Sequence, residues 1–108
     1  MTEEGKIQKK ILAILKDFED YGFVYHFRSQ VVQKGIVKSG KKGLPDITCC
    51  IKGRFVGIEV KSVAGTQKPE QIKAQEKIEK AGGEYYIVRD AGEVVKIINE
   101  KIFGRKKY

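Results

Sequence analysis

Two acidic residues and a lysine near the middle of the chain have the types and spacing of a metal-dependent hydrolytic site. Asp46 closes the segment 43–46, and Glu59 and Lys61 lie in the segment 58–61. Hard cations such as Mg²⁺ prefer a small number of carboxylates together with water, which leaves positions for a phosphate oxygen. A cation held here could polarise a phosphodiester and activate a water molecule, with Lys61 holding or deprotonating that water or neutralising developing charge.

The sequence between these residues predicts the β-hairpin that brings the two acids together. Two apolar runs, 47–51 and 54–58, flank the dipeptide Lys-Gly at 52–53. A two-residue connection that contains glycine between such runs is typical of a tight hairpin turn. Counting back from this turn along both strands places Asp46 directly opposite Glu59. Directly opposed residues have Cβ atoms about 5 Å apart on one face of a sheet.

The apolar pattern and the charge of the acid pair both support this register. The period of two places Lys61 on the same face as Glu59. The opposite face is unbroken apolar surface formed by Ile47, Cys49, Ile51, Val56, Ile58 and Val60. A slip of one residue would bury both acids and expose these side chains. Two opposed carboxylates repel each other unless a cation, a shared proton or a lysine offsets the repulsion, and a divalent cation fits best.

These segments resemble a known family, the PD-(D/E)XK nucleases, and within it the VRR-NUC (virus-type replication-repair nuclease) domains. The matching patterns are Gly-x-Pro-Asp at 43–46, Gly-Arg-x-x-Gly-Ile-Glu-Val-Lys at 53–61, and a glutamine-containing helix that ends in Ala-Gly-Gly at 71–83. The resemblance covers nearly the whole chain. It implies an α/β fold in which helices flank a central mixed β-sheet. It also implies a Mg²⁺- or Mn²⁺-dependent endonuclease whose stand-alone members are small homodimers that act on branched DNA.

The resemblance also assigns roles to individual residues of the hairpin. Asp46, Glu59 and Lys61 match the catalytic trio of the family. The carbonyl group of Val60 matches an additional metal ligand beside the two acids. The pattern leaves open whether the site holds one metal ion or two.

Two further site residues match the family on helices outside the hairpin. Glu4 resembles an acidic residue that reaches the site from the first helix, although Glu3 matches that position equally and acids near a helix N-terminus are ordinary dipole partners. Gln71 lies eleven residues before Gly82, as the glutamine of the family does. Gln75 follows one helical turn later and remains an alternative.

The net charge of the chain favours a polyanionic partner. The 108 residues are enough for one domain, 1–108, with a modest core. The chain has 22 Lys and Arg residues against 14 Asp and Glu residues, which gives a net charge of +8 and a pI near 9.5. Such a balance is typical of proteins that bind nucleic acid, and charge alone does not distinguish DNA from RNA.

A basic loop directly precedes the strand of the first acid. The backbone amides and two ammonium groups of the loop 39–43 could hold a phosphate next to the metal, or the loop could be solvated with lysines that keep the protein soluble. The basic tail 104–108 could reach a distant phosphate, or it could be a disordered segment that serves solubility. The candidate nucleic-acid-binding residues are Arg28, Lys38, Ser39, Lys41 and Lys42.

The remaining sequence predicts the order helix, three strands, helix, strand, helix. Thr2 is the expected N-cap of the first helix, and the segment 31–37 is expected either to extend and bend the first strand or to pair with another subunit. The apolar final helix is the alternative interface element. The expected elements are a helix over 3–21, strands over 23–27 and 31–37, the hairpin, a helix over 69–81, a strand over 85–88 and a helix after the capping box 90–93.

Several other classes of protein do not fit the sequence. No apolar run approaches the about 20 residues of a membrane span and no signal h-region is present, so we expect a soluble, cytoplasmic protein. Cys49 and Cys50 are adjacent on one strand and point to opposite faces, which argues against a disulfide framework or a zinc site. His26 is the single histidine and leaves no Ser/His/Asp constellation.

The sequence therefore predicts a metal-dependent DNA endonuclease, with branched substrates such as four-way junctions or flaps indicated by the resemblance alone. A restriction-type enzyme is the nearest enzymatic alternative, although so short a chain leaves little room for a base-reading element. A basic nucleic-acid-binding protein that no longer cuts, or an accessory subunit of a replication complex, are the alternatives from other classes. The presence of Asp46, Glu59 and Lys61 together favours the enzyme.

Overall fold

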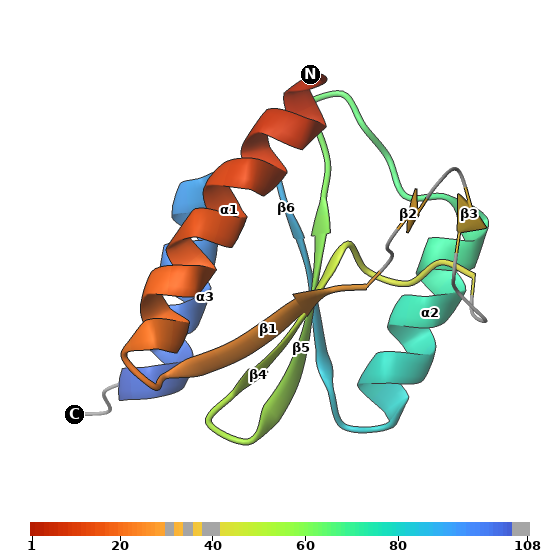
Figure 1. The fold of residues 1–108 in the computed structure, drawn as a ribbon. Coiled ribbons are helices and arrows are strands. Elements are labelled where there is room, and N and C mark those ends of the chain that lie inside the picture. Colours follow the sequence, from red (N-terminus) through yellow and green to blue (C-terminus); the bar gives the residue numbers. More distant parts are fainter. Residues whose placement is uncertain (30–31, 34–35, 38–41, 105–108) are drawn as a thin grey trace.

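A mixed β-sheet of four strands forms the centre of the protein. The computed structural model describes residues 1–29, 32–33, 36–37 and 42–104, whose main sheet has the strand order β1-β4-β5-β6 (Figure 1). The described elements are α1 (Glu3–Asp20), β1 (Val24–Arg28), β2 (Val32–Gln33), β3 (Ile36–Val37), β4 (Ile47–Ile51), β5 (Arg54–Val60), α2 (Pro69–Lys80), β6 (Glu84–Val88) and α3 (Ala91–Phe103). The expected α/β class with helices flanking a mixed sheet is confirmed.

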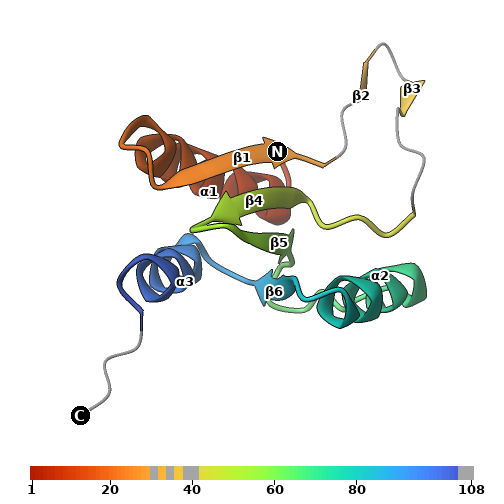
Figure 2. The same cartoon turned by 90° about the horizontal axis from the view of Figure 1, so that it is seen from below.

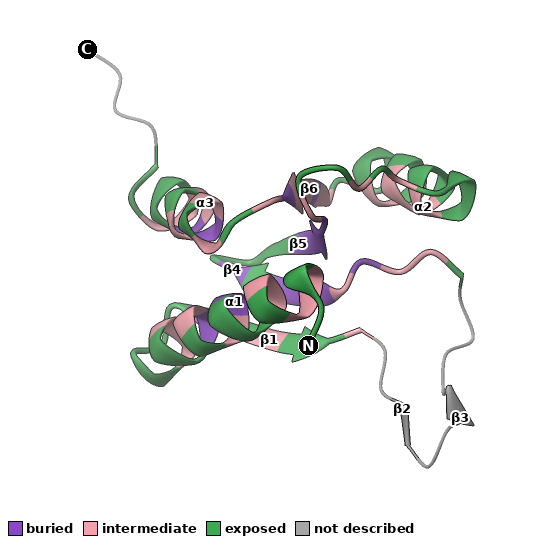
Figure 3. Ribbon diagram, turned by 90° about the horizontal axis from the view of Figure 1, so that it is seen from above, coloured by how far each residue is buried: buried purple, intermediate pink, exposed green. Residues whose placement is uncertain are grey.

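The two faces of the sheet differ in what covers them. Figure 1 shows α1 and α3 on one side of the sheet and α2 on the other, and Figure 2 shows α3 and α2 on opposite sides of β6. Buried residues lie on the strands and on α1 and α3, whereas α2 contains none (Figure 3). The core therefore occupies the face that α1 and α3 cover.

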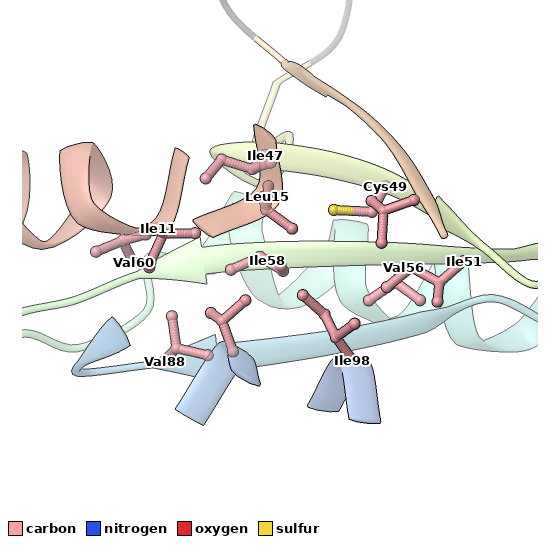
Figure 4. Close-up of a cluster of buried hydrophobic side chains, with 12 residues drawn as sticks. Ile11, Leu15, Ile47, Cys49, Ile51, Val56, Ile58, Val60, Val88 and Ile98 are labelled. Atoms are coloured by element: carbon pink, nitrogen blue, oxygen red, sulfur yellow. The ribbon is translucent and has the colours of Figure 1, made fainter. Parts of the chain in front are cut away.

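The β4–β5 hairpin has the predicted register. Ile47 pairs with Ile58, and Ile51 pairs with Arg54 across the two-residue turn. Both turn residues have positive φ, 52° at Lys52 and 79° at Gly53, as a type I′ hairpin turn requires. All six apolar residues predicted for the core face of the hairpin are buried there (Figure 4), namely Ile47, Cys49, Ile51, Val56, Ile58 and Val60.

The outer strands pair with the hairpin in different directions. β1 is antiparallel to β4, with Val24 opposite Ile51, whereas β6 is parallel to β5, with Val60 opposite Val88. The parallel pair needs a crossover, which α2 supplies on the face opposite α1 and α3. This crossover brings α2 over the sheet face that carries Asp46 and Glu59.

The helix ends follow the sequence signals with one difference. Thr2 caps α1, because its hydroxyl oxygen accepts a hydrogen bond from the amide of Gly5. Asp90 caps α3 by accepting from the amide of Glu93. The carboxylate of Glu93 accepts from the amide of Arg89, one residue before the N-cap, rather than from Asp90 as a capping box would have it. The amide of Arg89 is thereby held at the end of β6.

The segment predicted over 31–37 lies apart from the main sheet. Its described residues form two short strands, and β2 pairs with β3 antiparallel so that Val32 is opposite Val37. Within the described residues these strands do not extend β1, so the extension is not seen. Pairing of this segment with another subunit stays a prediction.

Two expectations about residue environments can also be compared with the structure. Cys49 is buried and Cys50 is exposed, as the strand alternation predicts, and both are free thiols. Of the helices in the described ranges, none is both long enough and apolar enough to span a bilayer.

Close contact between the hairpin strands fixes the chain that leads to Asp46. Pro45 is fully buried, and a Cβ atom at Gly57 would lie 2.9 Å from its Cγ. Any side chain larger than that of glycine at position 57 would therefore collide with the ring of Pro45.

We predict that Gly57→Ala lowers the free energy of unfolding by about 1–3 kcal/mol, because the added methyl group collides with the ring of Pro45. Pro45→Ala removes the colliding atom, so the double variant should be more stable than the sum of the two single effects predicts. Urea denaturation of the four proteins measures this coupling. Strict additivity would show that the contact does not constrain the hairpin.

Candidate active site

The carboxylate of Asp46 is tied to the neighbouring strand at the open end of the hairpin. Asp46 immediately precedes β4, and its Oδ2 accepts a hydrogen bond of 2.8 Å from the amide of Val60. Its carbonyl oxygen accepts from the amide of Ser29 at 3.0 Å. These contacts hold Asp46 between β1 and β5, on the sheet face opposite the core.

Glu59 is the most enclosed acidic side chain of the site. Only 3% of the residue is exposed. Its Oε2 accepts from the side-chain amide of Gln71 at 2.9 Å and lies 3.5 Å from Nζ of Lys61. Its Oε1 is buried and has no hydrogen-bond partner among the described residues. A buried oxygen without a partner is costly, so this atom is available to a ligand that supplies positive charge.

Gln71 is oriented by its own position in the first turn of α2. Its side-chain oxygen accepts from the amide of Lys68 at 2.8 Å, so the hydrogen-bond pattern directs its NH₂ group to Glu59. Gln75 instead contacts Gln67 and Glu79. Of the two glutamines that the sequence left open, the structure therefore brings Gln71 to the acid pair.

A glycine lets the first turn of α2 approach the chain that leads to Asp46. Gly43 has φ of 75°, and a Cβ atom there would lie 2.2 Å from the carbonyl oxygen of Glu70 and 2.9 Å from the amide nitrogen of Gln71. No other residue type could occupy this position without a shift of the backbone. The Gly-x-Pro-Asp segment thus positions α2 as well as Asp46.

Lys61 is buried beside Glu59 at the end of β5. The residue is 7% exposed, and its amide donates to the carbonyl of Val88 in β6. The backbone of Lys61 is therefore fixed in the sheet, and its ammonium nitrogen lies 3.5 Å from Oε2 of Glu59. Such a charge can hold a water molecule or an anionic oxygen close to Glu59.

The structure also distinguishes the two candidate acids of α1. Glu4 is half-buried, its Oε2 accepts from the amide of Ser62 at 3.4 Å, and its charge raises the pKa of Asp46. A Cβ atom at Gly65 would lie 3.3 Å from the same oxygen. Glu3 is exposed. Glu4 therefore lies at the margin of the site, engaged with the loop that follows Lys61.

Arg89 is a residue of this region that the sequence did not indicate. Its Nη1 donates to the carbonyl oxygens of Ser62 and Gly65, which clamps the loop 62–65. The parallel register of β5 and β6 places Arg89 beside the residues that follow Val60. Arg89 could be predicted as a neighbour of the site only from the register of β5 with β6, and the sequence does not specify that strand pairing.

Burial shifts the protonation of both acids in the same direction. Burial, followed by the charge of Asp46, raises the pKa of Glu59 to about 7, although Lys61 partly offsets the shift. Burial also raises the pKa of Asp46, against the opposing effects of the Val60 amide and of Lys61. The pair therefore tends to retain a proton near neutral pH unless a cation replaces it.

The donor set of the pair fits a hard divalent cation. Asp46 and Glu59 supply two carboxylates, and Val60 between Glu59 and Lys61 carries the predicted carbonyl ligand. Across the described ranges, no three His, Cys, Asp or Glu side chains gather in a way that could hold a metal ion. Two carboxylates with a carbonyl and water suit Mg²⁺ or Mn²⁺, and the partnerless Oε1 of Glu59 is an observation in favour of this fit.

The predicted nucleic-acid-binding residues are only partly described. Lys42 is exposed next to Gly43. Arg28 is exposed at the end of β1, and its pairing with Ile47 places it on the face of the sheet that α1 covers. Lys38, Ser39 and Lys41 lie outside the described residues, as does the tail 105–108.

Comparison with known proteins identifies the fold. No family model matches the chain, and no curated protein matches it. A solved structure described as a VRR_NUC domain matches with a TM-score of 0.68 and 22% sequence identity, over 92% of this chain and 97% of that one. The protein therefore has the nuclease-like fold of a VRR_NUC domain, and the resemblance noted in the sequence is confirmed for the fold.

We predict that the buried acid pair makes the metal-free protein less stable as pH rises. The pKa of Glu59 is about 7 in the folded state against an ordinary value of 4.5, so the folded state binds more protons between these values. The free energy of unfolding should therefore fall across this range, by up to about 3 kcal/mol. Denaturation at pH 5 and pH 8 in EDTA measures the fall.

The matched control is Glu59→Gln, which keeps the shape of the side chain and removes its titration. The stability of this variant should depend less on pH than that of the unsubstituted protein. Mg²⁺ at pH 8 should stabilise the unsubstituted protein and not the variant. Equal pH dependence of the two proteins would contradict the assignment of the raised pKa to Glu59.

Proposed function

We propose that this protein is a metal-dependent DNA endonuclease that hydrolyses phosphodiester bonds with Mg²⁺ or Mn²⁺. The observation that supports it best is the buried acid pair, in which an oxygen of Glu59 has no partner while Lys61 and Gln71 contact the other oxygen. A structural ion pair would satisfy both oxygens. The likeness to a VRR_NUC domain supports a nuclease over other hydrolases.

Each residue of the site has a distinct role in this proposal. Asp46 and Glu59 would hold the cation, together with the carbonyl of Val60. When bound, the ion would polarise the phosphodiester and lower the pKa of a coordinated water. Gln71 orients the carboxylate of Glu59 by donating to Oε2, and Oε1 is left without a partner among the described residues. Lys61 holds the attacking water or neutralises the charge that develops on the phosphate.

Glu4 contributes through the loop that follows Lys61. Its carboxylate accepts from Ser62, so it supports the chain immediately after the lysine. It also adds negative charge near Asp46, which strengthens the attraction for a cation. We assign it a supporting role at the margin of the site and do not count it among the direct ligands.

The substrate proposed is branched DNA, such as a four-way (Holliday) junction or a flap, in a process such as DNA repair. The net charge of +8 supports a polyanionic substrate, and the branched form rests on the family resemblance. A non-catalytic nucleic-acid-binding protein or an accessory subunit is the alternative. Retention of a buried, mutually repelling acid pair disfavours it, since the pair costs stability without a metal ion.

Substitutions of the acid pair test the chemistry directly. We predict that Asp46→Ala and Glu59→Ala each abolish cleavage of a labelled DNA panel in Mg²⁺, while DNA binding in Ca²⁺ or without metal survives. Lys61→Ala should leave metal binding largely intact and lower the cleavage rate by about 100-fold or more. Gel assays with and without Mg²⁺ measure cleavage.

The two glutamines of α2 provide a matched control for these substitutions. Gln71→Ala should slow cleavage because Glu59 loses its oriented donor, whereas Gln75→Ala should not, since the side-chain hydrogen bonds of Gln75 among the described residues are to Gln67 and Glu79. Full activity of both acid variants would refute the nuclease assignment. Equal effects of the two glutamine substitutions would refute the role given to Gln71.

A homodimer is proposed because one chain carries one acid pair, whereas resolving a four-way junction requires two symmetric nicks. A two-fold dimer supplies both sites and matches the symmetry of the junction. We predict a light-scattering mass of about twice the 12.2 kDa of the chain and paired nicks made within one complex. A monomer at micromolar concentration, or scattered nicks in unbranched duplex, would exclude junction resolution while leaving the nuclease chemistry intact.

A further inference from the structure

A groove with exposed lysines runs along α2, beside the segment that leads to Asp46. It has a volume of about 620 Å³ and is lined by residues of α2, of β5 and of the chain that leads into β4. We call it the α2 groove; its lining includes Lys42, Pro45, Phe55, Lys73, Lys77 and Ile78. Neither its lysines nor its aromatic ring has a role in the proposed catalytic site.

Two lining residues of the α2 groove are the immediate neighbours of site residues. Pro45 precedes Asp46, and Glu70 precedes Gln71, which donates to Glu59, so this end of the groove is the end nearer the acid pair. Phe55 marks the far end, four residues before Glu59 on β5. At about 3.3 Å per strand residue, the two lie roughly 13 Å apart along the strand.

The charges on the rim of the groove favour an anionic occupant. Lys42, Lys73 and Lys77 are exposed, and none of them forms an ion pair within the part of the chain that the structure describes. Glu70 is the one acidic residue of the lining. Lys73 and Lys77 are one helical turn apart, so both ammonium groups follow the same side of α2.

Exposed aromatic rings continue the far end of the groove across the sheet. Phe55 is 46% exposed, and Cys50, which pairs with it, pairs in turn with Tyr25. Phe27 lies two residues further along β1 and therefore on the same face. The residues Tyr25 and Phe27 are 65% and 52% exposed. Exposed rings beside a cationic groove are the arrangement on which unpaired bases stack.

From this arrangement we propose that the α2 groove binds an unpaired nucleic-acid strand and leads it to the acid pair. The lysines bind successive phosphates, and Phe55 stacks on a base. Stacking on Phe55 requires a base that is not already stacked and paired within a duplex, so the occupant is an unpaired strand. This proposal rests on the proposed function, and within it favours a flap, which carries an unpaired strand, over a fully paired four-way junction.

Charge disfavours a second copy of the chain as the occupant. Two copies that met through this face would bring six lysines together, in a protein that already carries a net charge of +8. A single strand instead releases counterions when the lysines bind its phosphates.

The test measures binding without cleavage. Fluorescence anisotropy in EDTA follows a labelled 15-nucleotide oligothymidylate and a blunt duplex of the same length. Lys73→Glu combined with Lys77→Glu should weaken strand binding by about 10-fold or more. Phe55→Leu, which keeps an apolar side chain and removes the ring, should weaken it roughly 5-fold or more and leave duplex binding unchanged.

The matched control makes the same charge change on the other side of the sheet. Lys10→Glu combined with Lys96→Glu alters exposed residues of α1 and α3, away from α2 (Figure 2). Strand affinity should fall less than 3-fold. Equal losses in the two double variants, or equal losses for strand and duplex with Phe55→Leu, would overturn the proposal. A halved light-scattering mass of the groove variants would also overturn it in favour of an interface between copies.

The binding measurements separate this proposal from the proposed catalysis. Specific loss of strand binding in the groove variants, with no cleavage by the unsubstituted protein in Mg²⁺, would support the groove and refute the nuclease. Cleavage that is lost in Asp46→Ala, with strand binding unaffected by all groove substitutions, would support the nuclease and refute the groove.

Discussion

The confinement of two mutually repelling carboxylates, one buried and one half-buried, is the constraint on which the rest of this structure depends. The hairpin and α2 bury Glu59 and partly bury Asp46, and this burial raises the pKa of both. The Val60 amide, the Gln71 amide and the Lys61 ammonium group offset part of this cost. These three groups do not offset the whole cost, because Oε1 of Glu59 remains without a hydrogen-bond partner among the described residues. This unpartnered oxygen is the feature of the site on which the proposed binding of a cation rests.

Close backbone approach gives the site its rigidity. Gly57 admits the ring of Pro45 onto β5, and Gly43 admits the first turn of α2 onto the same segment. Both contacts involve the segment 43–45, which leads directly to Asp46. Since α2 has no buried residue of its own, its placement depends on the contact at Gly43 and on polar bonds more than on apolar packing. A larger side chain at Gly57 would displace Pro45 beside Asp46, and one at Gly43 would displace the first turn of α2, which carries Gln71.

The sequence predicted the hairpin to the residue because two independent rules agree there. A two-residue turn with glycine sets the register, and the alternation of apolar residues permits no other. Contacts between elements were less predictable. Whether Glu3 or Glu4 approaches the loop after Lys61 depends on the rotation of α1, and the choice of Gln71 over Gln75 depends on where α2 lies over the sheet. No sequence pattern indicated the role of Arg89, because its contacts follow from the parallel pairing of β5 with β6.

The strict alternation of the hairpin also explains why stability and the acid pair can coexist in so small a protein. Each hairpin strand places its apolar residues against α1 and α3, where burial stabilises the fold, and the other face carries less of the apolar packing, such as Pro45 against Gly57. That face can then carry two acids, a lysine and exposed aromatic rings without opening a cavity in the core. The acids lie at the open end of the hairpin, beside a helix that has no buried residue. A cation at the pair would lower the repulsion and strengthen the link between β5 and α2 at the same time, so ligand binding and the ordering of α2 should be coupled.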